Sequence, residues 1–464
     1  MRPGDVEASL REVIMQKMTL IVGLGKTGQS ISRYLHYKNL PFAVYDTREA
    51  PPGEAFFRQT YPDIPLYLKT YPENLYDNVS KLICSPGVSL DIALLHEARV
   101  RAIPIESDID CLAREVDAPM VAITGTNGKS TVTCLLGEMA QAAGKKTAVA
   151  GNIGTPVLDF FLDEPGIFDV WVLELSSFQL ELTSALRPVA AVVLNISPDH
   201  LDRHHTPEAY RAAKHRVYQG AQACVFNRDD VETKPDLASL ESGVHIMSYG
   251  SDAPLNQNSW GLRYDTNHKL CLARGEALIL PVDEISMKGR HNWMNALATC
   301  ALAELLAIPM DVCVAVLKTF SGLPHRCQRV RVLDDVVWIN DSKGTNVGAT
   351  ESAITGLSSS VKGKLVLIAG GQGKGGDFQA LRQPVSEHVS ALVLIGEDAK
   401  LLDEALRDVV DIYHAVSLED AVKQAQSCAK SGDAVLLSPA CASLDMFDNF
   451  NHRGEVFTAL VHAL

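Results

Sequence analysis

A short glycine-rich loop in the middle of the chain has the residue types needed to bind phosphate. It follows a predicted strand over 119–124, precedes a predicted amphipathic helix, and consists of Gly125, Thr126, Asn127, Gly128, Lys129, Ser130 and Thr131. Backbone N–H groups of such a loop point at phosphate oxygens, while Lys129 can reach the terminal phosphates and Ser130 can ligate Mg²⁺. Although the loop is two residues shorter than the common P-loop pattern, it favours phosphate binding over a plain turn with a solvated lysine.

A second glycine turn lies near the N-terminus, where residues 23–28 read GLGKTG between a predicted strand and a predicted helix. Asp46 ends the next predicted strand, eighteen residues after Gly28. Glycine lets the backbone approach a diphosphate, and the helix N-terminus supplies positive potential. Taken alone, the turn predicts a nucleotide-diphosphate ligand; a tight strand–helix turn without a ligand is the alternative.

Acidic residues and a histidine follow two further predicted strands. Glu174 ends the strand over 169–174, and Asp199, His200 and Asp202 follow the strand over 190–195. Ligands of open parallel sheets bind at the carboxyl ends of the strands, and a carboxylate beside a phosphate loop suits the hard Mg²⁺ ion. A single histidine after a strand is more often structural, but the shared placement of these residues favours a functional role.

Three predicted strands in the last third of the chain end in polar turns. These turns span 340–346, 370–377 and 438–443, and they supply lysine, hydroxyl and glycine groups suited to an anionic small molecule. Ordinary turn chemistry is the alternative. It would be preferred if the phosphate loop and the acids were absent.

The order of the predicted elements indicates an α/β fold with three domains. A short aliphatic strand, a polar or glycine-rich turn and a helix alternate along the chain, and this pattern restarts three times, which predicts parallel sheets with crossover helices. We expect a Rossmann-like N-terminal domain at 1–107 with an N-terminal extension at 1–17. A central P-loop ATPase-like domain at 108–322 and a Rossmann-like C-terminal domain at 323–464 follow.

Composition and charge exclude several classes of protein. The chain has 464 residues and a formal net charge of −14, so its average surface repels nucleic acid and anionic membranes. No apolar run approaches the length of a membrane span, and residues 1–17 lack the apolar core of a secretory signal. The ten cysteines form no CxxC pair, which favours reduced thiols over a zinc site or disulfides. The sequence therefore predicts a cytoplasmic protein without nucleic-acid partners.

Eight motifs in one order make the sequence resemble the Mur ligase family from about residue 18 onward. They are GLGKTG at 23–28, ITGTNGKST at 123–131, LELSSFQLE at 173–181, NISPDHLDRH at 195–204, YRAAKHRVY at 210–218, GLPHR at 322–326, INDSKGTN at 339–346 and LLSPACASLDMFDNF at 436–450. The last motif is similar to that of the glutamate-adding members. The Asp-Asn-Pro-Arg signature of the diaminopimelate- or lysine-adding relatives is absent from the sequence.

The resemblance implies which ligand each domain binds. The first domain would hold the uridine diphosphate of UDP-N-acetylmuramoyl-L-alanine, the matching residues being Lys26, Thr27, Asp46, Thr47, Arg48, Ser85, Gly87 and Asn152. The central domain would bind ATP, and the matching nucleotide contacts outside its loop are Asn292, Asn295, Arg326 and Asp341. The third domain would position D-glutamate, the matching residues being Thr345, Lys374, Ser443 and Phe450, with Lys343 near the reacting groups.

The resemblance also implies two Mg²⁺ ions and an acyl-phosphate intermediate. Ser130 and Glu174, with Lys129, would serve one ion and the ATP phosphates, while His200 and Lys214 would hold the second. An ammonium group cannot ligate a cation, and in the family the matching lysine is carbamylated by CO₂, which supplies oxygen ligands. The alternative for Lys214 is a surface lysine on the predicted helix at 210–218. The resemblance further implies a monomer.

Other functions and two departures stay open. One alternative is a folate polyglutamylating ligase, but that relative lacks the first domain. A second is an NAD-dependent dehydrogenase, which would leave Lys129 and Ser130 without a role. A third is a non-catalytic nucleotide-binding regulator, which intact Lys129, Glu174, His200 and Lys214 argue against. Gln372 stands where a close homologue has aspartate, which puts the contacts there in doubt. Residues 1–14 match nothing in the family, and we expect them to be dispensable.

Overall fold

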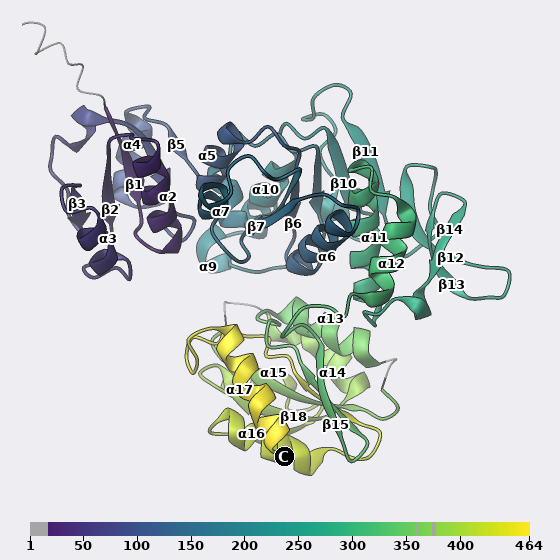
Figure 1. The fold of residues 1–464 in the computed structure, drawn as a ribbon. Coiled ribbons are helices and arrows are strands. Elements are labelled where there is room, and N and C mark those ends of the chain that lie inside the picture. The colour runs from purple at the N-terminus through teal and green to yellow at the C-terminus, as the bar shows by residue number, and fades with distance from the viewer. Residues whose placement is uncertain (1–16, 359–360, 374–376) are drawn as a thin grey trace, which may run out of the picture.

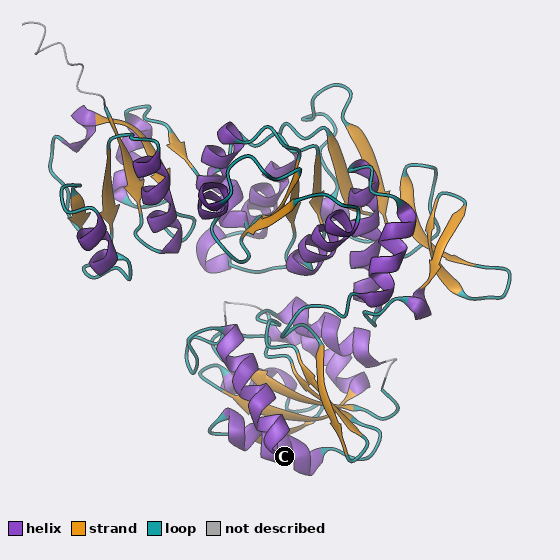
Figure 2. Ribbon diagram, viewed as in Figure 1, coloured by secondary structure: helices purple, strands orange, loops and turns teal. Residues whose placement is uncertain are grey.

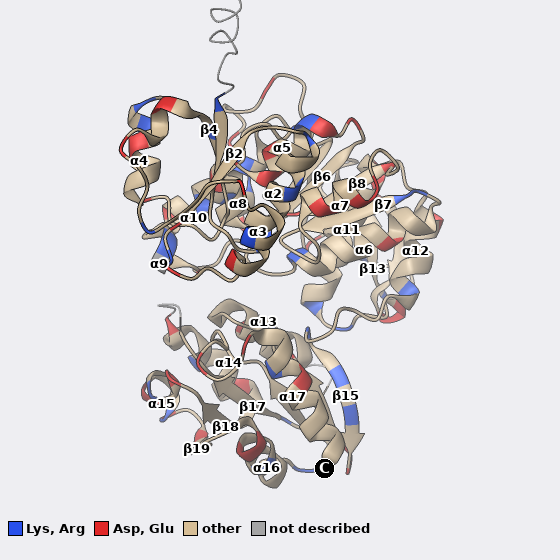
Figure 3. Cartoon of the chain, turned by 60° about the vertical axis from the view of Figure 1, so that its left-hand side comes forward, with Lys and Arg blue, Asp and Glu red and all other residues tan. Residues whose placement is uncertain are grey.

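The computed structural model describes residues 17–358, 361–373 and 377–464, so Lys374 and most of the expected N-terminal extension lie outside the described residues. Figure 1 shows three α/β bodies: the first and the central one lie side by side, and the third lies below the central one. Each body is a sheet with helices packed against it (Figure 2). Acidic and basic residues are interspersed along all three (Figure 3). Within the described ranges, no helix is long and apolar enough to cross a membrane.

The first body contains a five-stranded parallel sheet in the order β3-β2-β1-β4-β5. Its strands are β1 (Met18–Val22), β2 (Phe42–Asp46), β3 (Leu66–Leu68), β4 (Val79–Cys84) and β5 (Ile105–Glu106). Its helices are α2 (Lys26–Tyr37), α3 (Glu54–Thr60), η1 (Leu75–Asn78) and α4 (Ala93–Val100). Because β1 lies in the middle, the GLGKTG turn lies at the centre of the sheet's carboxyl edge.

The central body contains a nine-stranded sheet in the order β14-β13-β12-β11-β10-β9-β6-β8-β7. Its strands are β6 (Met120–Thr124), β7 (Thr147–Gly151), β8 (Val170–Glu174), β9 (Ala190–Val193), β10 (Ala223–Asn227), β11 (His245–Tyr249), β12 (Ser259–Tyr264), β13 (Leu270–Arg274) and β14 (Ala277–Pro281). Its helices are α5 (Asp108–Glu115), α6 (Lys129–Ala142), α7 (Val157–Asp163), α8 (Ser177–Leu182), α9 (Leu201–His204), α10 (Pro207–His215), η2 (Arg216–Tyr218), η3 (Val231–Thr233), η4 (Val282–Glu284), α11 (Arg290–Leu305) and α12 (Met310–Thr319). Since β6 pairs in parallel with both β8 and β9, the phosphate loop and the two acidic segments leave adjacent strand ends.

The third body contains a six-stranded sheet in the order β15-β16-β20-β17-β18-β19. Its strands are β15 (Gln328–Leu333), β16 (Val336–Asn340), β17 (Leu365–Gly370), β18 (Val389–Ile395), β19 (Asp411–His414) and β20 (Ala434–Leu437). Its helices are α13 (Val347–Ser358), η5 (Phe378–Leu381), α14 (Arg382–His388), α15 (Ala399–Leu406), α16 (Leu418–Cys428) and α17 (Phe450–Ala463). Because β16, β20 and β17 are neighbours, the three polar turns predicted from the sequence meet at one edge.

The α/β class and the predicted strands are confirmed, but two regions depart from an all-parallel arrangement. β12, β13 and β14 pair antiparallel, and β15 pairs antiparallel with β16. The connections are short turns such as Arg274-Gly275-Glu276 and Asp334-Asp335. A turn of that length can only join antiparallel strands, whereas a parallel pair needs a long crossover.

The first and central bodies share a packed interface beside α2 and α7. The Arg33 guanidinium donates paired hydrogen bonds to the Asp159 carboxylate, with Nε to Oδ1 at 2.8 Å. Next to this pair, Tyr34 contacts Phe161 edge-on, with ring centroids 6.4 Å apart. One apolar cluster continues from the first body into the central one, so this interface sets where the first sheet lies relative to the phosphate loop.

Candidate active site

The phosphate loop is held closed by its own lysine and by the neighbouring strand end. Lys129 Nζ donates to the carbonyl oxygens of Gly125 and Thr126, both at 2.9 Å. The Asn195 side chain binds both backbone groups of Asn127, accepting from its N–H at 2.7 Å and donating to its carbonyl at 3.0 Å. Gly128 has a φ of 80°, a conformation that glycine adopts without strain. The loop is therefore preorganised around the start of α6.

Glu174 and Lys214 are both buried beside this loop. Glu174 is 2% exposed; its Oε1 accepts from Asn152 Nδ2 at 3.0 Å, whereas its buried Oε2 has no hydrogen-bond partner. Lys214 is 1% exposed, and its Nζ donates to the Gly125 carbonyl at 2.8 Å and lies 4.5 Å from the Tyr210 ring centroid. The site thus has an unpartnered carboxylate oxygen and a buried amine close to one phosphate loop.

The pKa of Lys214 lies well below its usual range. Burial is the largest cause, and the positive charge of Lys129 lowers the pKa further, while Asp199 and Glu174 act in the opposite direction. Removing a lysine from water disfavours its charged form. Burial therefore favours the neutral form of the Lys214 amine.

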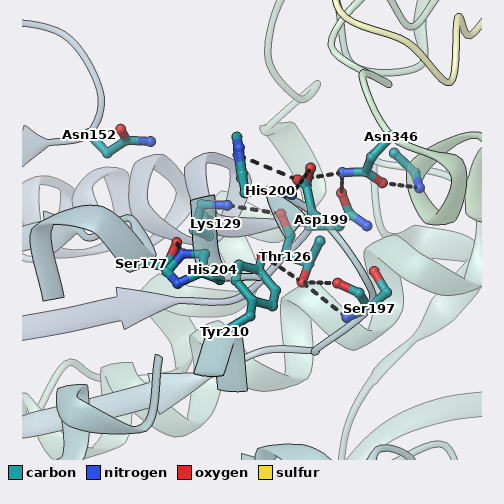
Figure 4. Close-up of polar contacts among 12 residues, drawn as sticks. Thr126, Lys129, Asn152, Ser177, Ser197, Asp199, His200, His204, Tyr210 and Asn346 are labelled. Carbon is teal, nitrogen blue, oxygen red and sulfur yellow. Dashed lines mark hydrogen bonds and ion pairs between the residues drawn. The ribbon is translucent and has the colours of Figure 1, made fainter. Parts of the chain in front are cut away.

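His200 is held in an unusual backbone conformation at the start of α9. Its φ is 54°, its N–H donates to Asp199 Oδ1 at 2.9 Å, and its Nε2 lies 3.6 Å from Asp199 Oδ2. The ring also meets Phe178 edge-on, with centroids 4.9 Å apart. Figure 4 shows His200 and Asp199 between Lys129 and Asn346.

A cavity of about 540 Å³ is lined by residues of all three bodies. The predicted site residues that line it are Lys26, Thr27 and Gly87 from the first body; Thr126, Asn127, Gly128, Lys129, Ser130, Asn152, Glu174, His200 and Lys214 from the central body; and Arg326, Lys343 and Thr345 from the third. The structure thus brings together most of the residues predicted for the phosphate loop, the acids and the lysines. Their individual roles stay predictions.

Two side chains of the third body contact the phosphate loop and the neighbouring Asp199. Arg326 Nη2 donates to Ser130 Oγ at 2.6 Å. Asn346 Nδ2 donates to Asp199 Oδ2 at 3.2 Å and contacts Asn127 Oδ1 at 3.4 Å (Figure 4). A cation and an amide from the third body therefore reach the groups that would surround a terminal phosphate.

Other predicted residues in the described chain lie outside the cavity lining. They are Asp46, Thr47, Arg48, Ser85, Gly125, Thr131, Asn292, Asn295, Asp341, Ser443 and Phe450. Several of these residues nevertheless contact residues of the glycine turn or of the cavity lining. Ser85 Oγ donates to the Gly23 carbonyl at 3.1 Å, and the Phe450 ring lies 4.0 Å from Lys343 Nζ. Asp341 accepts from Ser438 Oγ at 2.7 Å, and burial raises its pKa to about 6.

The sequence did not single out several residues that also line the cavity. They are Asp108, Gly151, Ile153, Gly154, Pro156, Ser176, Ser177, Phe178, Gln179, Tyr210 and Asn346. Position within a motif could have found Ser177, Phe178 and Gln179, which lie three to five residues after Glu174 in LELSSFQLE, and Asn346, which ends INDSKGTN. Nothing in the local sequence marks Asp108, which looks like an ordinary first residue of a helix.

The predicted metal ligands make an unusual set. Among the described residues, no three or more His, Cys, Asp or Glu side chains come together as a metal-binding group. The predicted set instead contains a serine hydroxyl and a lysine that would have to be modified. The two Mg²⁺ ions therefore stay a prediction.

Comparison with known proteins identifies the family. Residues 17–107 match the Mur ligase MurD-like N-terminal domain, residues 123–303 match the Mur ligase middle domain, and residues 325–441 match the Mur ligase glutamate ligase domain. The chain belongs to the Mur ligase family. The resemblance inferred from the eight motifs is confirmed.

Curated relatives of this chain share one name. UDP-N-acetylmuramoylalanine–D-glutamate ligase of Legionella pneumophila (strain Lens) is 59% identical over 445 residues, which cover 96% of this chain and 99% of the relative. The enzyme of the same name from Pseudomonas savastanoi pv. phaseolicola is 46% identical over 97% of this chain and 99% of its own length.

Solved structures with the same fold are more distant in sequence. MurF ligase from Thermotoga maritima, solved in complex with ADP, has a TM-score of 0.61 at 15% identity and covers 97% of this chain and 99% of that one. UDP-N-acetylmuramate–alanine ligase from the same organism has a TM-score of 0.56 at 18% identity, covering 96% and 99%. They support the three-domain arrangement and not the choice of substrate.

Proposed function

We propose that this chain is an ATP-dependent ligase that joins D-glutamate to UDP-N-acetylmuramoyl-L-alanine in peptidoglycan precursor synthesis. The observation that carries the proposal is the single cavity lined by Lys26 of the glycine turn, Lys129 of the phosphate loop and Lys343 of the third body. Each cation comes from a different body, as a reaction between three anionic substrates requires. The name shared by relatives at up to 59% identity supports the choice of substrates.

The chemistry follows from the weak electrophilicity of a carboxylate. The alanyl carboxylate attacks the γ-phosphorus of ATP, the bond to ADP breaks, and an acyl phosphate forms. The amine of D-glutamate then attacks the acyl carbon, inorganic phosphate leaves, and the amine loses a proton. Such steps depend mainly on positioning and charge stabilisation, and Lys129, Arg326 and the loop N–H groups would supply both.

The residues present fit a divalent cation. Glu174 Oε2 is buried without a hydrogen-bond partner, and Ser130, at the start of α6, lines the same cavity. Carboxylate and hydroxyl oxygens are ligands that Mg²⁺ prefers. When bound, Mg²⁺ neutralises phosphate charge; Ser130 and Glu174 would hold one ion, and His200 and modified Lys214 a second.

Lys214 fits carbamylation because burial favours its neutral amine. Burial and the charge of Lys129 depress its pKa, and only the neutral amine adds to CO₂. The new N–C bond turns the side chain into a carbamate anion with release of one proton. The carbamate would then stand in place of the amine that now donates to the Gly125 carbonyl.

The first-body turn offers little support for an NAD site. Asp46 Oδ2 accepts from the Leu24 N–H at 2.7 Å, and Arg48 Nε and Nη2 donate to the two carboxylate oxygens at 2.9 and 2.8 Å. A dinucleotide-binding acid instead leaves its oxygens for the ribose hydroxyls. We therefore assign the turn to the uridine diphosphate of the precursor, and we expect the enzyme to act as a monomer in the cytoplasm.

A phosphate-release panel tests the proposed function. Purified protein is mixed with ATP, Mg²⁺ and the UDP-linked precursor, and D-glutamate, L-glutamate, L-lysine or meso-diaminopimelate is added in separate reactions. The mass of each product is measured by mass spectrometry. We expect phosphate release and a product of the correct mass with D-glutamate only. Equal turnover with another amino acid would contradict the choice of D-glutamate, and release that does not need the precursor would contradict the ligase assignment.

A further inference from the structure

Arg203 of the central body makes a hydrogen bond to the loop at 85–88 of the first body. Its Nη1 donates to the Val88 carbonyl at 2.6 Å across the boundary between the two bodies. Its Nη2 donates to Glu181 at 3.2 Å, and its guanidinium carbon lies 5.1 Å from the Phe178 ring centroid. A guanidinium with a carbonyl, a carboxylate and an aromatic face around it has little freedom to move.

On the central side, these contacts fix the element that carries His200. Arg203 and His204 both lie on α9, whose N-cap is His200. His204 Nε2 is 2.9 Å from Ser177 Oγ, and its Nδ1 is 3.5 Å from Glu181. Figure 4 shows His204 beside Ser177, which lies three residues after Glu174 at the start of α8. The α8–α9 contacts therefore set the distance between the two segments predicted to bind Mg²⁺.

On the first-body side, Val88 belongs to a loop that is locked to the glycine turn. Ser85 N–H donates to the Val22 carbonyl at 2.9 Å, and Val88 N–H donates to the Ser85 carbonyl at 3.0 Å. A Cβ on Gly23 would lie 2.7 Å from Val88 Cγ2. The loop at 85–88 and the GLGKTG turn therefore move together, and Lys26, Thr27 and Gly87 from these two segments line the cavity.

We propose that Arg203 is a positioning residue that aligns the nucleotide-binding turn of the first body with the reaction centre around His200. This inference rests on the proposed function, because it requires a precursor that spans both bodies. The Arg33–Asp159 pair joins the bodies at α2 and α7, and Arg203 joins them again from α9, through the residue next to Gly87 of the cavity lining. In both Figure 1 and Figure 3, α9 lies on the side of the central body that faces the first one.

The position of Arg203 predicts a specific kinetic defect. A precursor bound by its nucleotide in the first body must place its alanyl carboxylate beside Lys129 and His200. Without Arg203, the nucleotide of the precursor should still bind to the first body, but its alanyl carboxylate should no longer reach Lys129 and His200. The affinity should therefore fall for the complete precursor and stay unchanged for UDP alone.

Calorimetry and kinetics with Arg203→Met test the inference. Affinity for the complete precursor should fall about tenfold, the size expected for loss of a charged hydrogen bond, while affinity for UDP alone should stay within about twofold. KM for the precursor should rise and KM for ATP should stay near the wild-type value. Arg203→Lys, which keeps one donor, should recover part of the affinity for the precursor.

Arg99→Met is the matched control. Arg99 Nη1 donates to the Leu90 carbonyl at 3.0 Å, two residues beyond Val88, but both residues belong to the first body. It should leave the ratio of precursor to UDP affinity unchanged. The inference is wrong if Arg203→Met keeps the wild-type ratio, or if Arg99→Met lowers it as much. Failure of the wild-type protein to bind the precursor would instead overturn the proposed function.

Discussion

Two helices in this molecule begin in the same way and yet present different chemistry. α2 begins at Lys26 after the N-cap Gly25, and α6 begins at Lys129 after the N-cap Gly128; each follows a buried parallel strand. In the central body, Lys129 turns back onto two carbonyls of its own loop. In the first body Lys26 is exposed, and the turn's Leu24 N–H donates to Asp46.

The difference lies in the neighbouring strand ends and not in the glycine spacing, and we expect it to decide what each turn binds. Beside the central loop lies Asn195, a neutral group that organises the loop without adding charge. Beside the first turn lies Asp46, whose carboxylate occupies one backbone N–H and is itself paired with Arg48. On the proposed function, we therefore expect the central loop to bind the triphosphate and the first turn to bind the less charged diphosphate.

The largest expected effect separates the two lysines. Lys129→Ala should lower kcat by about 10²–10³-fold, because one preorganised charge-stabilising donor is lost. Lys26→Ala should mainly raise KM for the precursor, by about tenfold or less, because an exposed charge contributes less. Steady-state kinetics at saturating ATP measure both. Near wild-type kcat in Lys129→Ala would contradict the phosphate-loop role, and unchanged melting temperatures exclude misfolding.

Lys214 gives the next largest effect. Lys214→Ala should lose about 10²-fold in activity, since the second ion would keep only His200 and water as ligands. A small carboxylate such as acetate should partly restore turnover by entering the vacated space. Lys214→Arg should stay inactive with acetate, because its side chain fills the space and remains cationic. Full activity of Lys214→Ala without acetate would exclude a role as metal ligand.

The sequence predicts those parts of the site that depend on strand order and local motifs. Lys129, Glu174 and His200 could be placed together because each follows a buried strand of one parallel sheet. The Arg203–Val88 contact could not be predicted, because it depends on how two separately folded sheets dock. The antiparallel pairing of β12, β13 and β14 could not be predicted, since the short turns between these strands carry no strong hairpin dipeptide.

Two glycines of the first turn distinguish packing from ligand approach. A Cβ on Gly28 would lie 1.9 Å from the Gly23 carbonyl oxygen, so Gly28→Ala should cost several kcal/mol, about 2–4, by forcing α2 from β1. A Cβ on Gly25 would meet nothing within 4 Å. Gly25→Ala should cost about 1 kcal/mol or less, while weakening precursor binding by obstructing the diphosphate.

Denaturant unfolding and precursor calorimetry separate the two outcomes. If Gly25→Ala were neutral for the precursor, the turn would be a structural feature only. Titration with NAD adds a further check, since neither the wild-type protein nor the variants should bind it. Micromolar NAD binding that Gly25→Ala abolishes, but that the UDP-linked precursor does not compete with, would reverse the assignment of the turn.

The last prediction concerns two buried acids whose pKa values shift in opposite directions: Asp46 at the end of β2 in the first body and Asp108 at the start of α5 in the central body. Burial would raise the pKa of Asp46, but Arg48 and the N–H groups of Leu24 and Arg48 outweigh it and lower the pKa. Asp108 is 3% exposed, its Oδ1 has no hydrogen-bond partner, and burial raises its pKa to about 6. The folded protein thus favours the charged form of Asp46 and disfavours that of Asp108.

The signs of these shifts predict opposite effects of two amide substitutions. Folding holds a proton on Asp108 more tightly than the unfolded chain does, so the charged carboxylate destabilises the protein above pH 6, and this penalty fades as pH falls toward 4. Asp108→Asn should therefore raise stability at pH 8 by on the order of 2 kcal/mol, and by less at pH 5. Asp46→Asn should lower stability at both pH values, because it removes a charge that Arg48 and Leu24 stabilise.

Denaturant unfolding of both variants and the wild-type protein at pH 5, 6.5 and 8 measures the differences. A loss of stability in Asp108→Asn at pH 8 would mean that Oδ1 has a partner in solution, and the carboxylate would then be a candidate ligand for the precursor.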